Sequence, residues 1–216
     1  DAMAITSELK DAHCVTEVKY RNALGEEYKT RAEALARLAT ETEKRRIADG
    51  ILLNQQGERL IEQGDAENAA HCFIESAEKG NAEGQTNAGF CHYYGQGIGQ
   101  DYKKAADYFN KAAIQGEPNA QYMLCKCYYD GKGVARDNKK AVEWATKSAK
   151  QGCHEAEYLL AWCKWSGTGT TKNTAEAIGL WQKSADASHC EAQWALGHIY
   201  LYGKNTKCDK KKAKTL

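Results

Sequence analysis

Two cysteine–histidine pairs are the residues of this chain whose types could bind a metal ion. Cys153-His154 and His189-Cys190 begin 36 residues apart, and each pair joins a thiol to an imidazole. Four such ligands complete the tetrahedral site that zinc prefers. The zinc hypothesis therefore depends on whether the fold brings the two pairs together.

Motifs for catalysis are scarce. The chain has neither the His-Glu-x-x-His motif of metalloproteases nor the Gly-x-Ser-x-Gly elbow of a serine nucleophile. Gly95-Gln-Gly-Ile-Gly99 resembles a phosphate-binding loop, but similar loops recur at Gly131 and Gly167. This recurrence indicates a structural role for the loop in each repeat. We therefore expect no enzymatic activity and no cofactor.

Large side chains that could bind a partner recur with a fixed period. Gly80, Gly116 and Gly152 stand 36 residues apart, and Ser188 takes the next place. Counted from these four residues, offsets 6, 10 and 13 share one face of a helix. Apart from Thr86 and Leu201, that face carries Phe90, Tyr93, Tyr122, Lys126, Tyr129, Tyr158, Trp162, Trp165, Trp194 and His198. Eight of these twelve side chains are aromatic, against 9% of the whole chain, so we expect this face to bind a partner.

Two helices and a glycine-rich loop must position these side chains in each period. A small residue at offset 4 and an apolar residue at offset 8 predict a first helix, helix A, whose buried face differs from its aromatic face. After the loop, four residues are placed to cap a second helix, helix B: Asp101, Asp137, Asn173 and Asp209. A period of this length built from a helix pair predicts a stacked repeat protein.

Composition agrees with a helical binding protein. The chain has 216 residues, a formal net charge of +1 and one proline. Its long stretches of Ala, Glu, Lys and Gln favour helices throughout. A charge near zero gives no general attraction to nucleic acid, and no apolar run approaches the roughly 20 residues that span a bilayer. We expect neither nucleic acid binding nor membrane insertion.

The repeats resemble a known family. Similarity to Sel1-like repeats, which are relatives of the tetratricopeptide repeat, is carried by Gly116-Glu-Pro-Asn-Ala120, Tyr128-Tyr-Asp-Gly-Lys-Gly-Val134, Asp137-Asn-Lys-Lys-Ala141 and the run from Trp144 to Gly152. The resemblance covers about residues 80–216. It departs from the family at Lys164, which replaces a core tyrosine, and at Asn205, which replaces a loop glycine. It implies an all-α, right-handed α-solenoid of antiparallel helix pairs, with helix A lining the concave face.

The same offsets divide the chain into segments. Residues 80–115, 116–151 and 152–187 are predicted to be full Sel1-like repeats, and residues 188–216 a repeat that is truncated in helix B. We therefore expect the natural protein to continue beyond Leu216. Upstream, residues 48–79 are similar to a tetratricopeptide repeat that extends or caps the same stack.

Residues 1–47 are predicted to be an N-terminal helical segment without repeats. Helical spacing is found in Leu24, Tyr28, Leu35 and Leu38. A break near Gly25 indicates two helices, and a further break near Thr40 stays open. Both a capping hairpin and a separate coiled-coil arm fit this segment.

The nine cysteines bear on the cellular compartment. Cys91, Cys127 and Cys163 share offset 11, close to the core positions, and are expected to be small buried hydrophobes. Disulfide-stapled relatives in the resembling family carry paired cysteines in both helices of a unit, whereas helix B of the three full units here has none. A reducing compartment such as a bacterial or host cytosol is therefore favoured. Repeat stacking would also keep the two cysteine–histidine pairs apart, so we expect no metal site.

The sequence as a whole predicts a non-enzymatic adaptor or scaffold. It would hold a peptide segment or a helix of a partner protein in a concave aromatic groove. Neighbouring repeats or the N-terminal helices could instead bury the same rings. As an alternative function, the chain could be a regulatory or sensing module of a larger protein whose catalytic or effector region lies outside it.

Overall fold

The computed structural model of the chain describes residues 20–21, 27–28 and 31–202, with side chains from residue 39 onward. The chain falls into two compact units that divide between Asp49 and Gly50. Helix pairs dominate the second unit, which carries the predicted repeats.

The N-terminal unit contains two short antiparallel strands, β1 (Tyr20–Arg21) and β2 (Glu27–Tyr28), in a register that places Tyr20 opposite Tyr28. The helical spacing assigned to Tyr28 was therefore wrong. Tyrosine fits extended backbone well, so strand pairing competes effectively with a helix here. The break predicted near Gly25 lies outside the described residues.

α1 (Arg31–Glu62) is a continuous helix of 32 residues. It passes through Thr40 and also through residue 48, where a separate segment was expected to begin. No proline interrupts this stretch and its many Ala, Glu and Arg residues favour helix, so the helix is continuous across the predicted boundary between residues 47 and 48.

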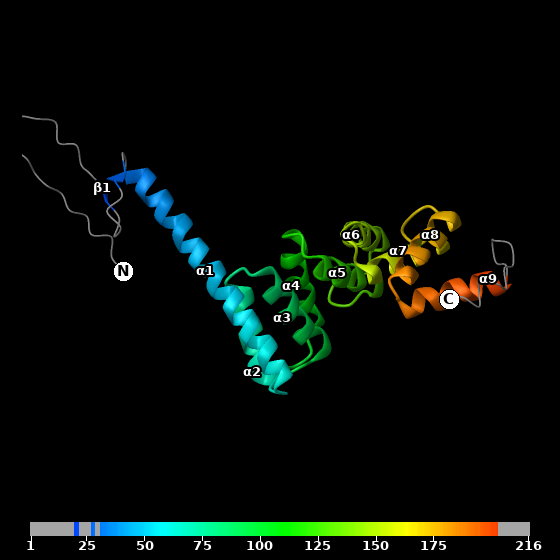
Figure 1. The fold of residues 1–216 in the computed structure, drawn as a ribbon, viewed down its shortest axis with the longest axis horizontal. Helices are drawn as coiled ribbons and strands as arrows, with labels where there is room; N and C mark the ends of the chain where they lie inside the picture. Colours follow the sequence, from blue (N-terminus) through cyan, green and yellow to red (C-terminus); the bar gives the residue numbers. More distant parts are fainter. Residues whose placement is uncertain (1–19, 22–26, 29–30, 203–216) are drawn as a thin grey trace, which may run out of the picture. The chain divides into compact units, whose positions relative to one another are not determined.

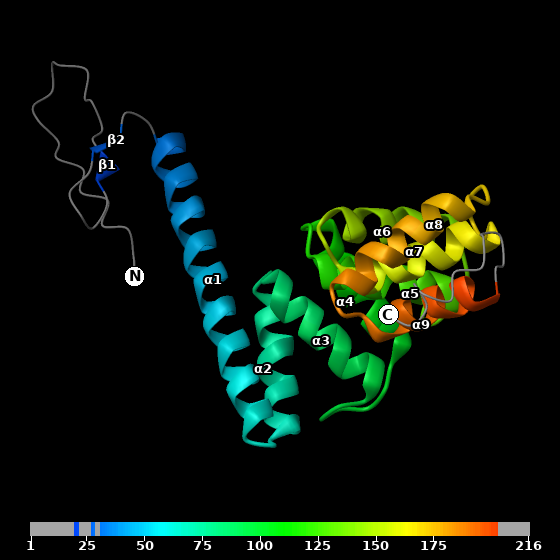
Figure 2. The same cartoon turned by 45° about the vertical axis from the view of Figure 1, so that its right-hand side comes forward.

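The remaining described helices have 13 residues each and form the predicted series of pairs. They are α2 (Ala66–Glu78), α3 (Ala82–Tyr94), α4 (Tyr102–Ile114), α5 (Pro118–Asp130), α6 (Asn138–Lys150), α7 (His154–Ser166), α8 (Thr174–Asp186) and α9 (Cys190–Tyr202). Consecutive helices from α2 to α9 pack against one another. In both ribbon views α6 and α8 lie on the side of α7 that faces away from α9 (Figures 1 and 2). The predicted all-α solenoid of helix pairs is confirmed.

The ends of the helices lie where the sequence placed them. Asp101, Asp137 and Asn173 each accept backbone N–H groups from the first turn of helix B, as expected of N-cap residues. Asp209 lies outside the described residues. Among the described non-glycine residues, Ser188 alone has a positive φ, of 67°, because it stands where earlier repeats have glycine.

The core pairs a large residue on one helix with a small residue on the other. Phe109 of α4 lies against Gly89 of α3, where an added Cβ would lie 2.6 Å from the ring. Trp181 of α8 shares a core cluster with Ala161 of α7. In the repeat between them helix A carries the larger Cys125 instead. Close packing of this kind couples the sizes of facing residues.

Polar side chains connect one repeat to the next. Gln121 Nε2 donates to the carbonyl oxygen of Ala113 at 3.2 Å, and Gln121 Oε1 accepts from Gln151 Nε2 at 2.9 Å. In the following repeat Glu157 replaces the glutamine and pairs with Lys183. Because these groups lie at the helix ends, they fix how successive pairs stack.

Candidate functional site

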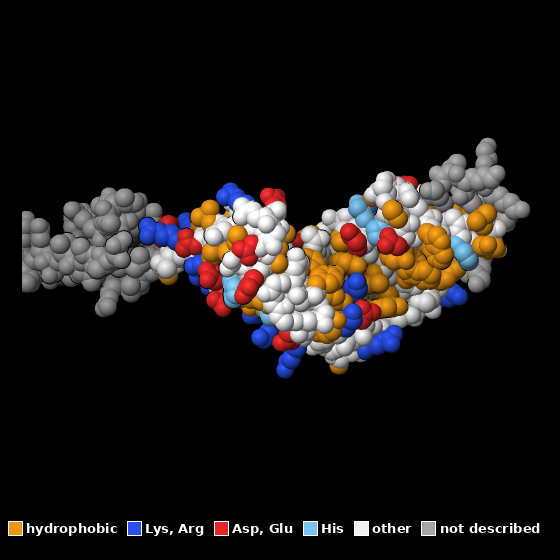
Figure 3. Space-filling view, turned by 90° about the horizontal axis from the view of Figure 1, so that it is seen from below, with side chains coloured by type: hydrophobic (Ala, Val, Ile, Leu, Met, Phe, Trp, Pro, Cys, Tyr) orange, Lys and Arg blue, Asp and Glu red, His pale blue; other side chains and the backbone are white. Residues whose placement is uncertain are grey.

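The aromatic face is carried by α3, α5, α7 and α9, which are the A helices of successive repeats. The first three end at Gly95, Gly131 and Gly167, each in the left-handed conformation. Because these helices have equal lengths, residues with the same offset lie at the same position along each helix A. Figure 3 shows hydrophobic side chains gathered on one face of the C-terminal repeats, with a few charged side chains and histidines among them.

The rings on α7 are half-buried against their own repeat. Trp162 and Trp165 contact the core residue Trp181, with ring centroids 5.1 and 5.5 Å apart. Tyr158 lies 6.4 Å from Trp162 in an edge-to-face arrangement and 5.1 Å from the ring of His189. These three predicted residues thus form one ring cluster, and helix packing accounts for part of their surface.

Tyr93 is a core residue. Its side chain is 3% exposed, and its ring lies 6.2 Å from Phe109 and 5.2 Å from Tyr102. Its assignment to the open face was wrong, because offset 13 turns toward helix B, where Phe109 fills the space. Phe90 lies edge-on to the same Phe109 ring at 5.5 Å and remains half-exposed.

The α5 part of the face combines two tyrosines with a cation. Tyr122, Lys126 and Tyr129 are all half-buried. Burial raises the pKa of Tyr122 above its ordinary value, so its hydroxyl stays protonated and can donate a hydrogen bond. Arg136 lies over the Tyr129 ring at 5.9 Å. In the described part of the chain, Lys126 forms no ion pair, so its charge is available to a ligand.

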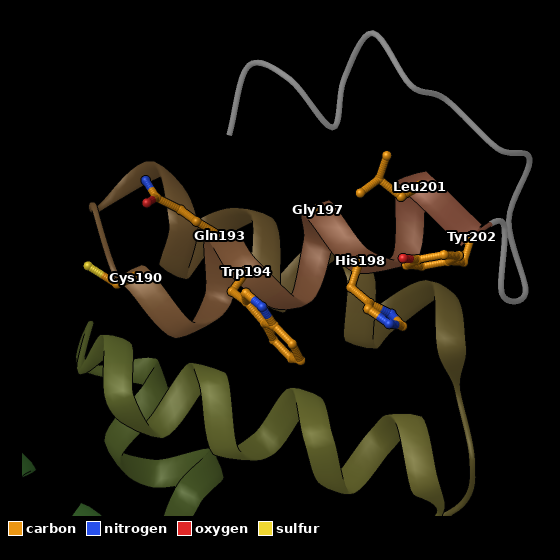
Figure 4. Close-up of a pocket in the computed structure, with 7 residues that line it drawn as sticks. All are labelled: Cys190, Gln193, Trp194, Gly197, His198, Leu201 and Tyr202. Atoms are coloured by element: carbon orange, nitrogen blue, oxygen red, sulfur yellow. The ribbon is translucent and has the colours of Figure 1, made fainter.

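The last described helix carries the most exposed rings. Trp194 is 67% exposed, and its ring lies 5.6 Å from that of His198, which in turn lies 4.6 Å from Tyr202. Trp194 and His198 project from the same side of α9, away from Gln193 (Figure 4). They line a pocket of about 480 Å³. An exposed tryptophan of this extent is typical of a binding surface.

Two exposed tyrosines were missed by the sequence reasoning. Tyr94 and Tyr202 occupy offset 14 and are 58% and 69% exposed. Each follows a ring at offset 10 by four residues, and Tyr94 stacks on Phe90 with centroids 6.2 Å apart. The i, i+4 spacing on a helix could have identified both.

The cysteine–histidine pairs do not form a metal centre. Within the described residues no group of three or more His, Cys, Asp or Glu is placed to hold a metal ion. His154 Nδ1 lies 3.0 Å from Glu157 Oε2, and Cys153 Sγ donates to Glu155 at 3.3 Å. The contacts of Cys153 and His154 thus lie within their own repeat, whereas the ring of His189 contacts Tyr158 of the preceding repeat.

The offset-11 cysteines are buried, as predicted. Burial raises the pKa of Cys91, Cys127 and Cys163 to about 11. A buried thiol that stays protonated is a poor nucleophile. These residues therefore contribute packing to the site and no reactive group.

Stacked helix pairs with a ring-bearing A-helix face define a class, the α-helical repeat proteins of the tetratricopeptide type. Sequence comparison is more specific. The family model described as Sel1 repeat matches residues 32–81, 82–117, 118–153, 154–189 and 190–216. The chain belongs to the Sel1 repeat family, whose members generally mediate protein interactions and whose fold is typically a non-catalytic scaffold.

Three solved structures of bacterial proteins have a similar fold. A Sel1 repeat protein from Oxalobacter formigenes is 29% identical, with a TM-score of 0.69, over 74% of this chain and 66% of that one. The protein c5321, a protective antigen of uropathogenic Escherichia coli strains, is 24% identical, with a TM-score of 0.63, over 86% of this chain and 47% of that one. A putative Sel1 repeat protein from Klebsiella pneumoniae is 18% identical, with a TM-score of 0.55, over 76% of this chain and 82% of that one.

This chain therefore spans less than two thirds of the length of the first two structures. No curated protein sequence matches it. Among the described helices, none combines the length and the apolar character that crossing a membrane requires.

Proposed function

We propose that this protein is a non-enzymatic adaptor that binds a peptide segment or a helix of a partner protein along the helix-A face. The observation that carries the proposal is the exposed series Trp194, His198 and Tyr202 on α9. Like these residues, the half-buried rings of α5 and α7 belong to the A helices of their repeats. Large rings with polar tips provide much contact area at a low cost in conformational entropy.

The half-buried rings suit a groove floor, and the exposed rings suit contact with the ligand. Trp162 and Trp165 are held in place by Trp181, so little ordering is required when a ligand arrives. Lys126 supplies a cation among these rings, which favours a ligand with an acidic or carbonyl group opposite it.

Selection from a random dodecapeptide phage library on the immobilised full chain tests the proposal. Synthetic copies of selected peptides are titrated by fluorescence anisotropy against the wild type, Trp194→Ala and Lys126→Ala. The matched control is Ile114→Ala, which removes an exposed apolar side chain from helix B. Circular dichroism checks that each variant is folded.

We expect Trp194→Ala to weaken binding about tenfold or more, since truncation of a central aromatic residue costs roughly 2 kcal/mol or more. Ile114→Ala should leave the affinity unchanged. Failure to select any peptide, or equal affinities of Trp194→Ala, Lys126→Ala and wild type, would overturn the assignment of the helix-A face.

A further inference from the structure

A second pocket lies on the N-terminal repeat of the same unit. It has a volume of about 450 Å³ and is formed by residues of α1, α2 and α3 and of the loop after α3. Ile61, Phe90 and Tyr94 contribute apolar lining, and Glu58 and Glu62 contribute carboxylates. The pocket thus combines rings with concentrated negative charge, unlike the pocket around Trp194.

A hydrogen bond positions the carboxylate of Glu58, and no cation of the described residues neutralises either carboxylate. Asn54, which is 1% exposed, donates from Nδ2 to Glu58 Oε1 at 2.9 Å. Asn87 Nδ2 in turn donates to Asn54 Oδ1 at 2.9 Å. Glu62 follows Glu58 by one helical turn. Within the described residues neither glutamate has an ion-pair partner, so both charges face solvent and the pocket.

Among the described residues, cations lie over several aromatic rings but over neither Phe90 nor Tyr94 of the pocket. The chain's own cations cover several rings elsewhere, namely Lys111 over Tyr108, Lys132 over Tyr93 and Tyr102, Arg136 over Tyr129, Lys140 over Tyr128 and Lys147 over Trp144. Phe90 and Tyr94 stack with an interplanar angle of 15°, and no described cation lies over either ring. A cation supplied by a ligand would complete the arrangement seen elsewhere.

We propose that this pocket binds a lysine or arginine side chain of a partner peptide, together with a neighbouring apolar side chain. The cation lies between the carboxylates of Glu58 and Glu62 and the ring of Tyr94, and the apolar side chain packs on Ile61 and Phe90. Charge complementarity selects this occupant, since two carboxylates disfavour an acidic ligand. The proposal rests on the proposed function and names the ligand chemistry at one end of the same face.

The test compares selection from the random dodecapeptide phage library on three full-length proteins. They are the wild type, Glu58→Gln/Glu62→Gln, and the control Glu75→Gln/Glu78→Gln, which removes the same charge from exposed positions of α2 outside the pocket. The readouts are the frequency of Lys and Arg in selected peptides and the Kd of one synthetic peptide at low and at high salt.

The wild type and the control should select peptides enriched about twofold or more in Lys and Arg beside an apolar residue. Glu58→Gln/Glu62→Gln should lose this enrichment, bind the synthetic peptide about tenfold more weakly and lose most of the salt dependence. Selected peptides without such enrichment, or equal Kd values for the three proteins, would overturn this proposal alone. Selection of no peptide would overturn the proposed function as well.

The competing candidate for the same pocket is the lysine-rich stretch at residues 204–214 of the chain itself. A Lys210→Gln/Lys211→Gln/Lys212→Gln variant separates the two. Unchanged peptide affinity in this variant supports the partner peptide. An affinity that rises about tenfold, and falls again when Glu58→Gln/Glu62→Gln is added, would assign the pocket to the chain's own segment and overturn the proposal.

Discussion

Whether an individual residue is core or exposed depends on its position in the helix and on the side chain that packs against it. Tyr93 and Trp194 both belong to the predicted aromatic face, yet one is core and the other is largely exposed. Tyr93, at offset 13, turns toward helix B and lies against Phe109, whereas Trp194, at offset 6, contacts the exposed ring of His198. The surroundings also lower the pKa of the buried residue His92.

His92 should make the stability of the protein depend on pH in the weakly acidic range. Burial, helped by Lys104, lowers the pKa of His92 below its ordinary value of 6.5, and its ring stacks on Tyr108 at 5.7 Å. The folded state therefore favours the neutral ring. Its contribution to stability is fully present above pH 6.5 and is lost as pH falls through the lower folded-state pKa.

The measurement is urea unfolding of the wild type and of His92→Tyr between pH 7.5 and 5.5. The substitution copies Tyr128, which occupies the same offset in the next repeat, and it should reduce the loss of unfolding free energy over this range. His71→Asn, at an exposed position of α2, is the control and should keep the wild-type slope. Identical pH slopes for His92→Tyr and wild type would contradict the assignment.

At the scale of elements, packing between helices A and B is governed by matched sizes. Gly89 lies under the Phe109 ring, whereas Gly179 on α8 has open space where a Cβ would be. Both are helical glycines with ordinary φ, so the same substitution tests two opposite physical effects.

Gly89→Ala should destabilise the protein by about 1–3 kcal/mol, since overpacking forces the ring or the backbone to move. Gly179→Ala should stabilise it by about 0.5–1 kcal/mol, because alanine favours helix over glycine. Chemical denaturation gives both values. Gly89→Ala/Phe109→Leu should recover part of the loss, and a double variant no more stable than Gly89→Ala would argue against the proposed size matching.

At the scale of the whole repeat array, stability should be divided among neighbouring helix pairs. Helix contacts from α2 to α9 are mainly between consecutive helices, and such arrays behave approximately as a sum of repeat and interface terms. A core defect in one repeat should therefore loosen that repeat and its neighbours more than distant ones.

Trp181→Ala provides the test, because Trp181 is among the largest fully buried side chains of the described residues. The expected loss is about 3–5 kcal/mol of local stability. Hydrogen exchange read by mass spectrometry should show faster exchange in α7, α8 and α9, with α3 and α4 close to wild type. Equal acceleration in all helices would indicate one cooperative unit instead.

The sequence by itself determined the helix pairs, their caps and the buried offsets. The glycine period, the Asp and Asn caps and the alternation of small and apolar residues are local signals, and Asp101, Asp137 and Asn173 act where these signals placed them. The helical assignment of Tyr28 was wrong, because Tyr28 lies in the strand β2.

The tertiary structure decided which of the repeated side chains are open to a ligand. Exposure depends on the volume of residues that arrive from another helix, as Phe109 does beneath Tyr93 and Trp181 beneath Trp162. It also depends on groups that line one pocket only after folding, as the carboxylate of Glu58 and the ring of Tyr94 do in the N-terminal pocket. Neither quantity follows from the spacing of one helix, because both are properties of the space between helices.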